Sequence, residues 1–82
     1  MRHDHLEPQG GGQLEGRYSN YFQVGHNAAE FLLDFGQFYR EGTHARLHTR
    51  IVTSPMYAKA LFEILRESLD RYEQTFGAIP KE

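Results

Sequence analysis

The sequence predicts an α+β fold in which a three-stranded antiparallel β-meander is followed by one long C-terminal α-helix packed on one sheet face. Three stretches between residues 17 and 53 are rich in aromatic and β-branched residues and alternate between two faces. The stretch after residue 54 instead repeats its apolar residues at helical spacing. We therefore expect one β-β-β-α domain over residues 17–80.

Residues 1–16 precede this domain and contain a triple glycine, one proline and few apolar side chains. Ordering the backbone costs roughly 1–2 kcal/mol per residue, and this segment has little apolar surface to offset that cost. We expect a flexible glycine-rich tail.

The first expected strand covers residues 17–24, with Phe22 and Val24 on one face and Tyr21 on the other. Residues 25–29 read "GHNAA" and supply the glycine and asparagine that a turn favours. The first two strands should therefore form a hairpin.

The second expected strand, residues 31–39, is apolar on both faces. Leu33 and Phe35 should face the helix, whereas Leu32 and Phe38 lie on the opposite side. One helix covers one face of a sheet, so the second face needs a second subunit or a ligand.

Within this strand, Asp34-Phe35-Gly36 matches the magnesium-binding triplet of protein kinases. A kinase also needs a glycine-rich loop, a strand lysine and a catalytic Asp–Asn loop, and the sequence contains none of them. We interpret Phe35 as a core residue, Asp34 as a partner of Arg46 or Arg50, and Gly36 as a bulge or close backbone contact.

A loop at residues 40–44 leads to the third expected strand, residues 45–53. Strict alternation places Leu47 and Ile51 on one side. The opposite side is basic and consists of His44, Arg46, His48 and Arg50.

The helix is expected to begin with Ser54 as N-cap and Pro55 in its first turn, and to end at Gly77. The segment between them is about 33 Å long as a helix, which matches a strand of about ten residues. One apolar stripe follows its length through Ala58, Phe62, Leu65, Leu69, Tyr72 and Phe76. We expect this stripe to pack on the sheet; pairing with the helix of a second subunit is the alternative.

Three parts of the chain, Asn20-Tyr21, "FLLDFGQ" at residues 31–37 and "RIVTSPMYAKALFEILRESLDRYEQTFG" at residues 50–77, resemble a widespread family of small prokaryotic domains of unknown function. Its members share an aromatic first strand, a strand close to "EF-x-LDFGQ" and a strand-to-helix junction close to "R-x-V-x-SP-x-x-AK-x-L". The resemblance covers about residues 18–77, leaves the glycine-rich tail outside, and implies an intracellular setting but no catalytic residues.

The composition indicates where the protein acts and which kinds of surface it contains. The chain has no cysteine, a net charge of −2 and no apolar run long enough to span a membrane. Its six phenylalanines and five tyrosines are many for 82 residues, and such rings gather in cores and interfaces. We expect a cytoplasmic protein that does not bind membranes.

Histidines are the candidate metal ligands, but their spacing argues against a site. His44 and His48 lie about 13 Å apart along an extended strand, too far to hold one ion together, and His26 lies at the first turn. His3 could join the amino terminus in binding copper or nickel, although a histidine often occurs there by chance. No metal or cofactor is predicted; a pH-sensitive patch at His44 and His48 is the alternative.

The sequence predicts a non-enzymatic interaction module that forms a homodimer, with other proteins as further candidate partners. No cysteine is available as a nucleophile, and the helix carboxylates lie on the outward face. The expected dimer interface comprises Tyr21, Leu32, Phe38 and Tyr39. The alternative function is single-stranded nucleic-acid binding, in which bases stack on rings and phosphates meet cations. Its candidate cationic contacts are Arg40, Arg46, His48 and Arg50.

Overall fold

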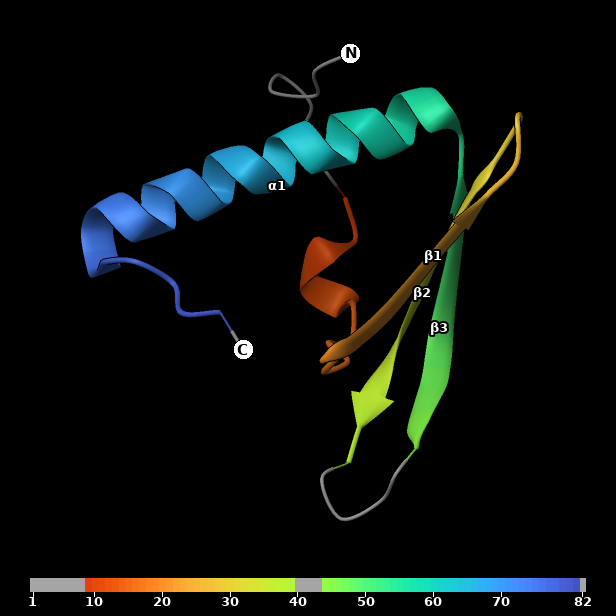
Figure 1. Ribbon diagram of the computed structural model, residues 1–82, viewed down its shortest axis with the longest axis horizontal. Helices are drawn as coiled ribbons and strands as arrows, with labels where there is room; N and C mark the ends of the chain where they lie inside the picture. Colours follow the sequence, from red (N-terminus) through yellow and green to blue (C-terminus); the bar gives the residue numbers. More distant parts are fainter. Residues whose placement is uncertain (1–8, 40–43, 82) are drawn as a thin grey trace.

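The computed structural model describes residues 9–39 and 44–81. Its sheet has the antiparallel order β1-β2-β3 and is followed by one helix, α1 (Figure 1), so the predicted α+β class and order are confirmed. The elements are a 3₁₀ turn η1 (Gly11–Gln13), β1 (Tyr21–His26), β2 (Phe31–Phe38), β3 (Ala45–Thr53) and α1 (Pro55–Phe76). The flexible tail over residues 1–16 stays a prediction, since residues 1–8 lie outside the described residues.

The first strand begins and ends later than the sequence predicts. β1 runs from Tyr21 to His26, so Gly25 belongs to the strand and not to the turn. The turn starts at Asn27, whose Oδ1 accepts hydrogen bonds from the backbone N–H groups of Ala29 (2.8 Å) and Glu30 (2.9 Å). An asparagine side chain therefore sets this hairpin.

Both predicted ends of the helix are confirmed. The Ser54 hydroxyl accepts a hydrogen bond from the backbone N–H of Tyr57 (3.2 Å), and Pro55 occupies the first turn. Gly77 ends α1 with φ 98°, a left-handed value that glycine adopts without steric cost, and its N–H donates to the carbonyl of Glu73.

Strand pairing divides the sheet into two faces. Phe22 pairs with Phe35 and Val24 with Leu33, so these side chains share what we call the Phe35 face. The apolar residues of the Phe35 face are Phe22, Val24, Phe31, Leu33, Phe35 and Ile51. Residues that alternate with these, centred on Asp34, form the Asp34 face.

The predicted unbroken alternation of the third strand is wrong, because β3 contains a bulge. Phe35 pairs with Thr49 but Gly36 pairs with Leu47, which leaves His48 as an extra residue. Beyond the bulge the strand changes face, so Leu47 lies on the Asp34 face. Arg46 pairs with Gln37 and lies on the Phe35 face.

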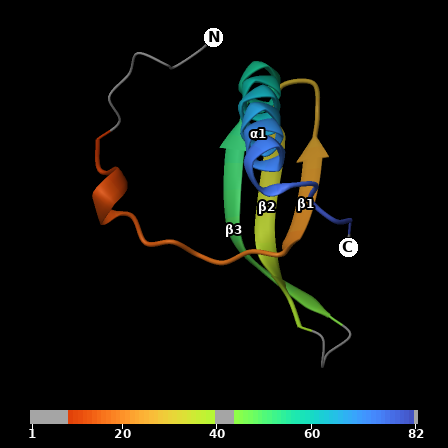
Figure 2. The same cartoon turned by 90° about the vertical axis from the view of Figure 1, so that its left-hand side faces the viewer.

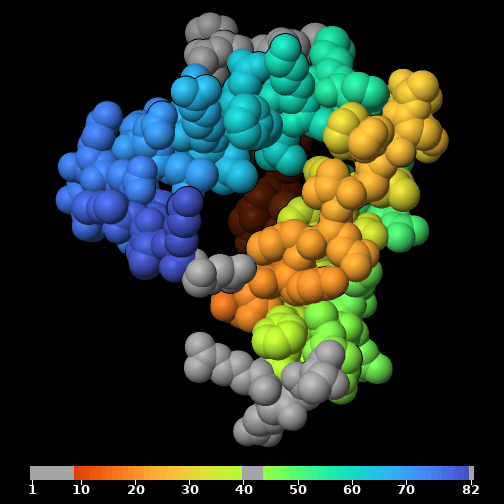
Figure 3. Space-filling view, in the orientation of Figure 1, coloured from red at the N-terminus to blue at the C-terminus, as the bar shows by residue number. Residues whose placement is uncertain are grey.

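The prediction that α1 packs on its own sheet is wrong. Figure 2 shows α1 over the sheet, but in Figure 1 the two diverge like the arms of a V, and Figure 3 shows the molecule hollowed between them. No residue of α1 is buried, and neither is any apolar side chain of the described residues. Ser54, the N-cap of α1, is the only residue between β3 and α1, so its backbone conformation sets the direction of the helix relative to the sheet.

Candidate functional site

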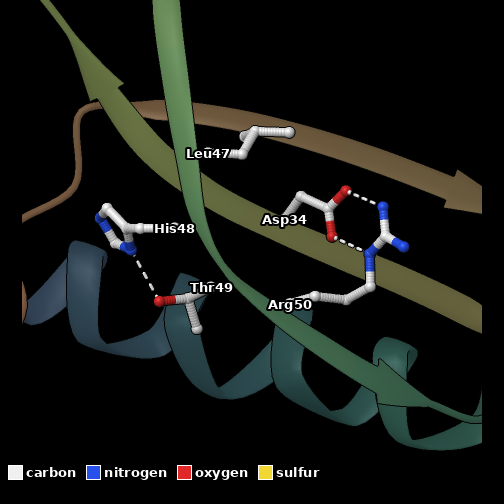
Figure 4. Close-up of a pocket in the computed structure, with 5 residues that line it drawn as sticks. All are labelled: Asp34, Leu47, His48, Thr49 and Arg50. Carbon is white, nitrogen blue, oxygen red and sulfur yellow. Dashed lines mark hydrogen bonds and ion pairs between the residues drawn. The ribbon is translucent and has the colours of Figure 1, made fainter.

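The centre of the Asp34 face is an ion pair between neighbouring strands (Figure 4). Arg50 on β3 donates from Nε to Asp34 Oδ1 (2.7 Å) and from Nη2 to Oδ2 (2.8 Å), which is a bidentate geometry. Asp34 lies on the middle strand and is 7% exposed, whereas the Arg50 side chain is 60% exposed. The predicted pairing of Asp34 with the basic strand is confirmed, and Arg50 is its partner.

This ion pair shifts the pKa of both groups toward their charged forms. The hydrogen bonds from Arg50 lower the pKa of Asp34, its positive charge acts in the same direction, and burial opposes them. The same hydrogen bonds and the charge of Asp34 raise the pKa of Arg50. Neither group is therefore suited to exchange a proton near neutral pH.

His48, the extra residue of the bulge, uses both ring nitrogens within the chain. Its Nε2 lies 3.1 Å from the carbonyl oxygen of Tyr18, which can only accept, so Nε2 carries the hydrogen. Its Nδ1 lies 2.6 Å from the Thr49 hydroxyl, and the two point at each other in Figure 4. His48 therefore serves to hold Tyr18 against the sheet.

The segment before β1 is fastened across β2 by side chains that sequence analysis did not assign. Ser19 Oγ donates to the carbonyl of Gly36 (2.8 Å) and accepts from its N–H (3.0 Å). Asn20 Oδ1 accepts from the N–H of Phe38 (2.7 Å). Polar side chains in an aromatic stretch were the available signal, because serine and asparagine readily bond to backbone groups.

Gly36 is buried under a close backbone contact, as predicted. A Cβ atom at this position would overlap the carbonyl oxygen of Arg46 and approach the Leu47 Cα to 2.8 Å. The bulge and this contact occur at the same place in the sheet. Glycine is therefore required here by the approach of β3.

The residues predicted for the dimer interface lie mostly together. Strand register puts Tyr21, Leu32 and Phe38 on the Asp34 face. Tyr21 and Leu32 are partly covered, whereas Phe38 and Tyr39 are half exposed. Tyr39 follows the end of β2, where its hydroxyl donates to Gln37 Oε1 (3.0 Å).

The basic residues predicted on one strand face are separated. Arg46 is on the Phe35 face, and Arg50 is engaged by Asp34 on the other face. Arg40 lies outside the described residues. The predicted cationic stripe is therefore broken by the bulge.

The candidate metal ligands are also apart. His44 is exposed before β3, and His26 stacks on Phe31 with ring centroids 5.1 Å apart. Within residues 9–39 and 44–81, no three histidine or carboxylate side chains gather in a metal-binding arrangement. His3 lies outside this part of the chain.

No described helix has the length and apolar character needed to cross a bilayer.

The described residues also form two exposed apolar surfaces that no predicted site includes. One is the Phe35 face, where Phe22 meets Phe35 edge-on at 5.8 Å but remains 59% exposed. The other is the predicted stripe of α1, in which Phe62 is 61% exposed and Phe76 72%. Figure 4 views the Asp34 face with α1 behind the strands, so the Phe35 face and α1 lie on the same side of the sheet.

Comparison with protein families gives a match over most of the chain. The family model described as "Protein of unknown function (DUF3467)" matches residues 9–81. The match begins before the segment on which the resemblance rests and takes in part of the glycine-rich tail. No curated protein and no solved structure matches the chain.

Proposed function

The chain belongs to the DUF3467 family of proteins of unknown function, and we propose that this member is a non-enzymatic interaction module that acts as a homodimer in the cytoplasm. Its first partner is a second copy of itself, and other proteins are further candidate partners. The proposal concerns binding, with no cofactor, no metal and no membrane contact.

One observation carries this proposal. Of the described residues, no apolar side chain is buried, while many large ones along β1, β3 and α1 stay exposed. Soluble monomers rarely expose continuous apolar surfaces of this kind, and such surfaces mark interaction sites. Because the secondary structure is nevertheless complete and capped, the missing core is best supplied by another chain.

The Asp34–Arg50 pair supports a binding role over a catalytic one. Catalytic acids and bases have pKa values shifted toward the working pH. Asp34 and Arg50 show the opposite shifts, since each stabilises the charged form of the other. The most buried charged residue of the described chain is thus used to join β2 and β3.

Sedimentation equilibrium tests the proposal, because the mass it gives does not depend on molecular shape. We expect twice the 9.5 kDa chain mass at micromolar concentration. A single species at 9.5 kDa, with a folded far-UV circular dichroism spectrum, would overturn it.

Single-stranded nucleic-acid binding stays a prediction and is not part of the proposal, since no contact in the sheet favours it. Arg46 and Arg50 lie on opposite faces, and the His48 ring is already bonded to Tyr18 and Thr49. The observation that would support it is a gel-mobility shift of a single-stranded oligonucleotide probe that weakens with added salt and is lost in the variant Arg46→Glu/Arg50→Glu.

A further inference from the structure

We propose that the two copies exchange their helices: α1 of each copy lies in the V of the other and packs its apolar stripe on the partner's Phe35 face. This inference rests on the proposed homodimer and says which surfaces form it. It replaces the expected interface on the Asp34 face as the main contact between the copies.

The arrangement of the V supports this exchange. α1 and the Phe35 face lie on the same side of the sheet and diverge from the junction at Ser54 (Figures 1 and 4). The V therefore has apolar side chains on its sheet arm and on its helix arm, and the space between the arms is open in Figure 3. A second V with the same composition can enter it, and a two-fold axis makes both contacts identical.

The two surfaces match in length. α1 has 22 residues, which at 1.5 Å per residue is about 33 Å. β3 has 9 residues, which at about 3.3 Å per residue is about 30 Å. The helix that carries the stripe is thus about as long as β3, the longest strand of the partner's sheet.

The exposed aromatic side chains alone provide nearly the area that a specific dimer interface buries. Phe22, Phe62, Tyr72 and Phe76 are 59%, 61%, 50% and 72% exposed. At about 200 Å² per aromatic residue, these four rings expose about 500 Å² per copy and about 1,000 Å² in a pair. That figure reaches the lower bound of specific interfaces before any aliphatic side chain is added.

Helix exchange covers more apolar surface than the other arrangements of two copies. Pairing α1 with α1 would leave the Phe35 face of each sheet open. Pairing the two Asp34 faces would leave both surfaces of the V open. The apolar face of a sheet gains stability when another apolar layer excludes water from it, and the partner's helix supplies that layer.

Isotope-filtered nuclear Overhauser spectroscopy tests this exchange on the unmodified chain. Uniformly ¹³C,¹⁵N-labelled protein is unfolded and refolded with an equal amount of unlabelled protein, so that mixed dimers form. We expect contacts between the chains from Leu65, Leu69 and Tyr72 to Leu33, Phe35 and Ile51.

The result separates this inference from the proposed function. A dimeric mass with inter-chain contacts only between the two helices, or only between residues of the two Asp34 faces, would overturn helix exchange and leave the homodimer intact. Contacts from α1 to the Phe35 face within one chain would also overturn it. A monomeric mass would overturn both.

Discussion

β2 and α1 differ in how completely the chain covers them. β2 is paired on both edges and contains the two buried residues of the described chain, Asp34 and Gly36. α1 is longer and equally regular, yet none of its residues is buried. Regular secondary structure alone therefore does not indicate a complete core.

The difference follows from the kind of contact each region can make. The middle strand satisfies its polar groups within the chain, through Arg50 on one side and Ser19 on the other. The helix carries apolar groups, and these gain stability only when another apolar surface excludes water from them. Changes in α1 should therefore affect assembly, whereas changes in β2 should affect the folding of each chain.

The largest effect is expected from a charge in the middle of the stripe. Leu65→Asp would bury an unpaired carboxylate twice in each dimer, at about 3–5 kcal/mol for each. We expect the dimer dissociation constant to rise by at least about a hundredfold, measured by sedimentation equilibrium.

Arg66→Asp is the matched control, because it introduces the same residue one position along, on the polar face of α1. We expect Arg66→Asp to destabilise the helix by only a few tenths of a kcal/mol, as other like-charge neighbours on a helix surface do, and to leave the dimer dissociation constant nearly unchanged. Equal weakening by the two variants would show that α1 does not assemble through its stripe.

Gly36→Ala should produce the next largest effect, this time in β2. The added Cβ would meet the backbone of Arg46 and Leu47, which cannot rotate away as a side chain can. Overpacking of this kind costs about 1–3 kcal/mol of unfolding free energy, measured by urea denaturation.

Gly25→Ala tests whether the cost comes from the contact or from losing a glycine. Gly25 is also in a strand, but a Cβ there would have no atom within 4 Å. We expect little change or a small gain, since alanine restricts the unfolded chain. If both variants lost the same stability, the close approach at the bulge would not explain the glycine.

The same comparison explains which features could be predicted from sequence. The ends of α1, the order of the strands and the pairing of Asp34 with a basic neighbour depend on local signals such as Ser54, Gly77 and charge alternation. These signals act over a few residues, so the sequence alone was sufficient to predict the features that depend on them.

The position of α1 and the bulge at His48 were not predictable in the same way. Apolar periodicity shows that a helix needs cover but does not show which chain provides it. The bulge depends on the approach of Arg46 to Gly36, which alternation along β3 alone does not reveal. The basic stripe was a consequence of assuming unbroken alternation.

A smaller effect is expected at the junction between β3 and α1. Ser54→Ala removes the acceptor for the N–H of Tyr57 and should cost about 1 kcal/mol of unfolding free energy. Ser68→Ala is the control within the helix, where alanine favours the helical state. Thermal denaturation at one protein concentration compares them; no loss in Ser54→Ala would show that the cap does not hold the junction.

The smallest effect should come from the Asp34–Arg50 pair, because most of the Arg50 side chain is exposed to water. The pKa of Asp34 is lowered in the folded state, so this carboxylate binds fewer protons when folded than when unfolded. Its contribution is therefore complete above the unfolded pKa of about 3.9 and is lost as the pH falls through the lower folded value.

Urea denaturation of the native chain and of Asp34→Asn at equal concentration from pH 7 to pH 2 measures the difference in unfolding free energy between the two. We expect the native chain to be the more stable at pH 7 and this advantage to shrink below about pH 4. A difference that stays constant across this range would show that Arg50 does not stabilise the charged form of Asp34.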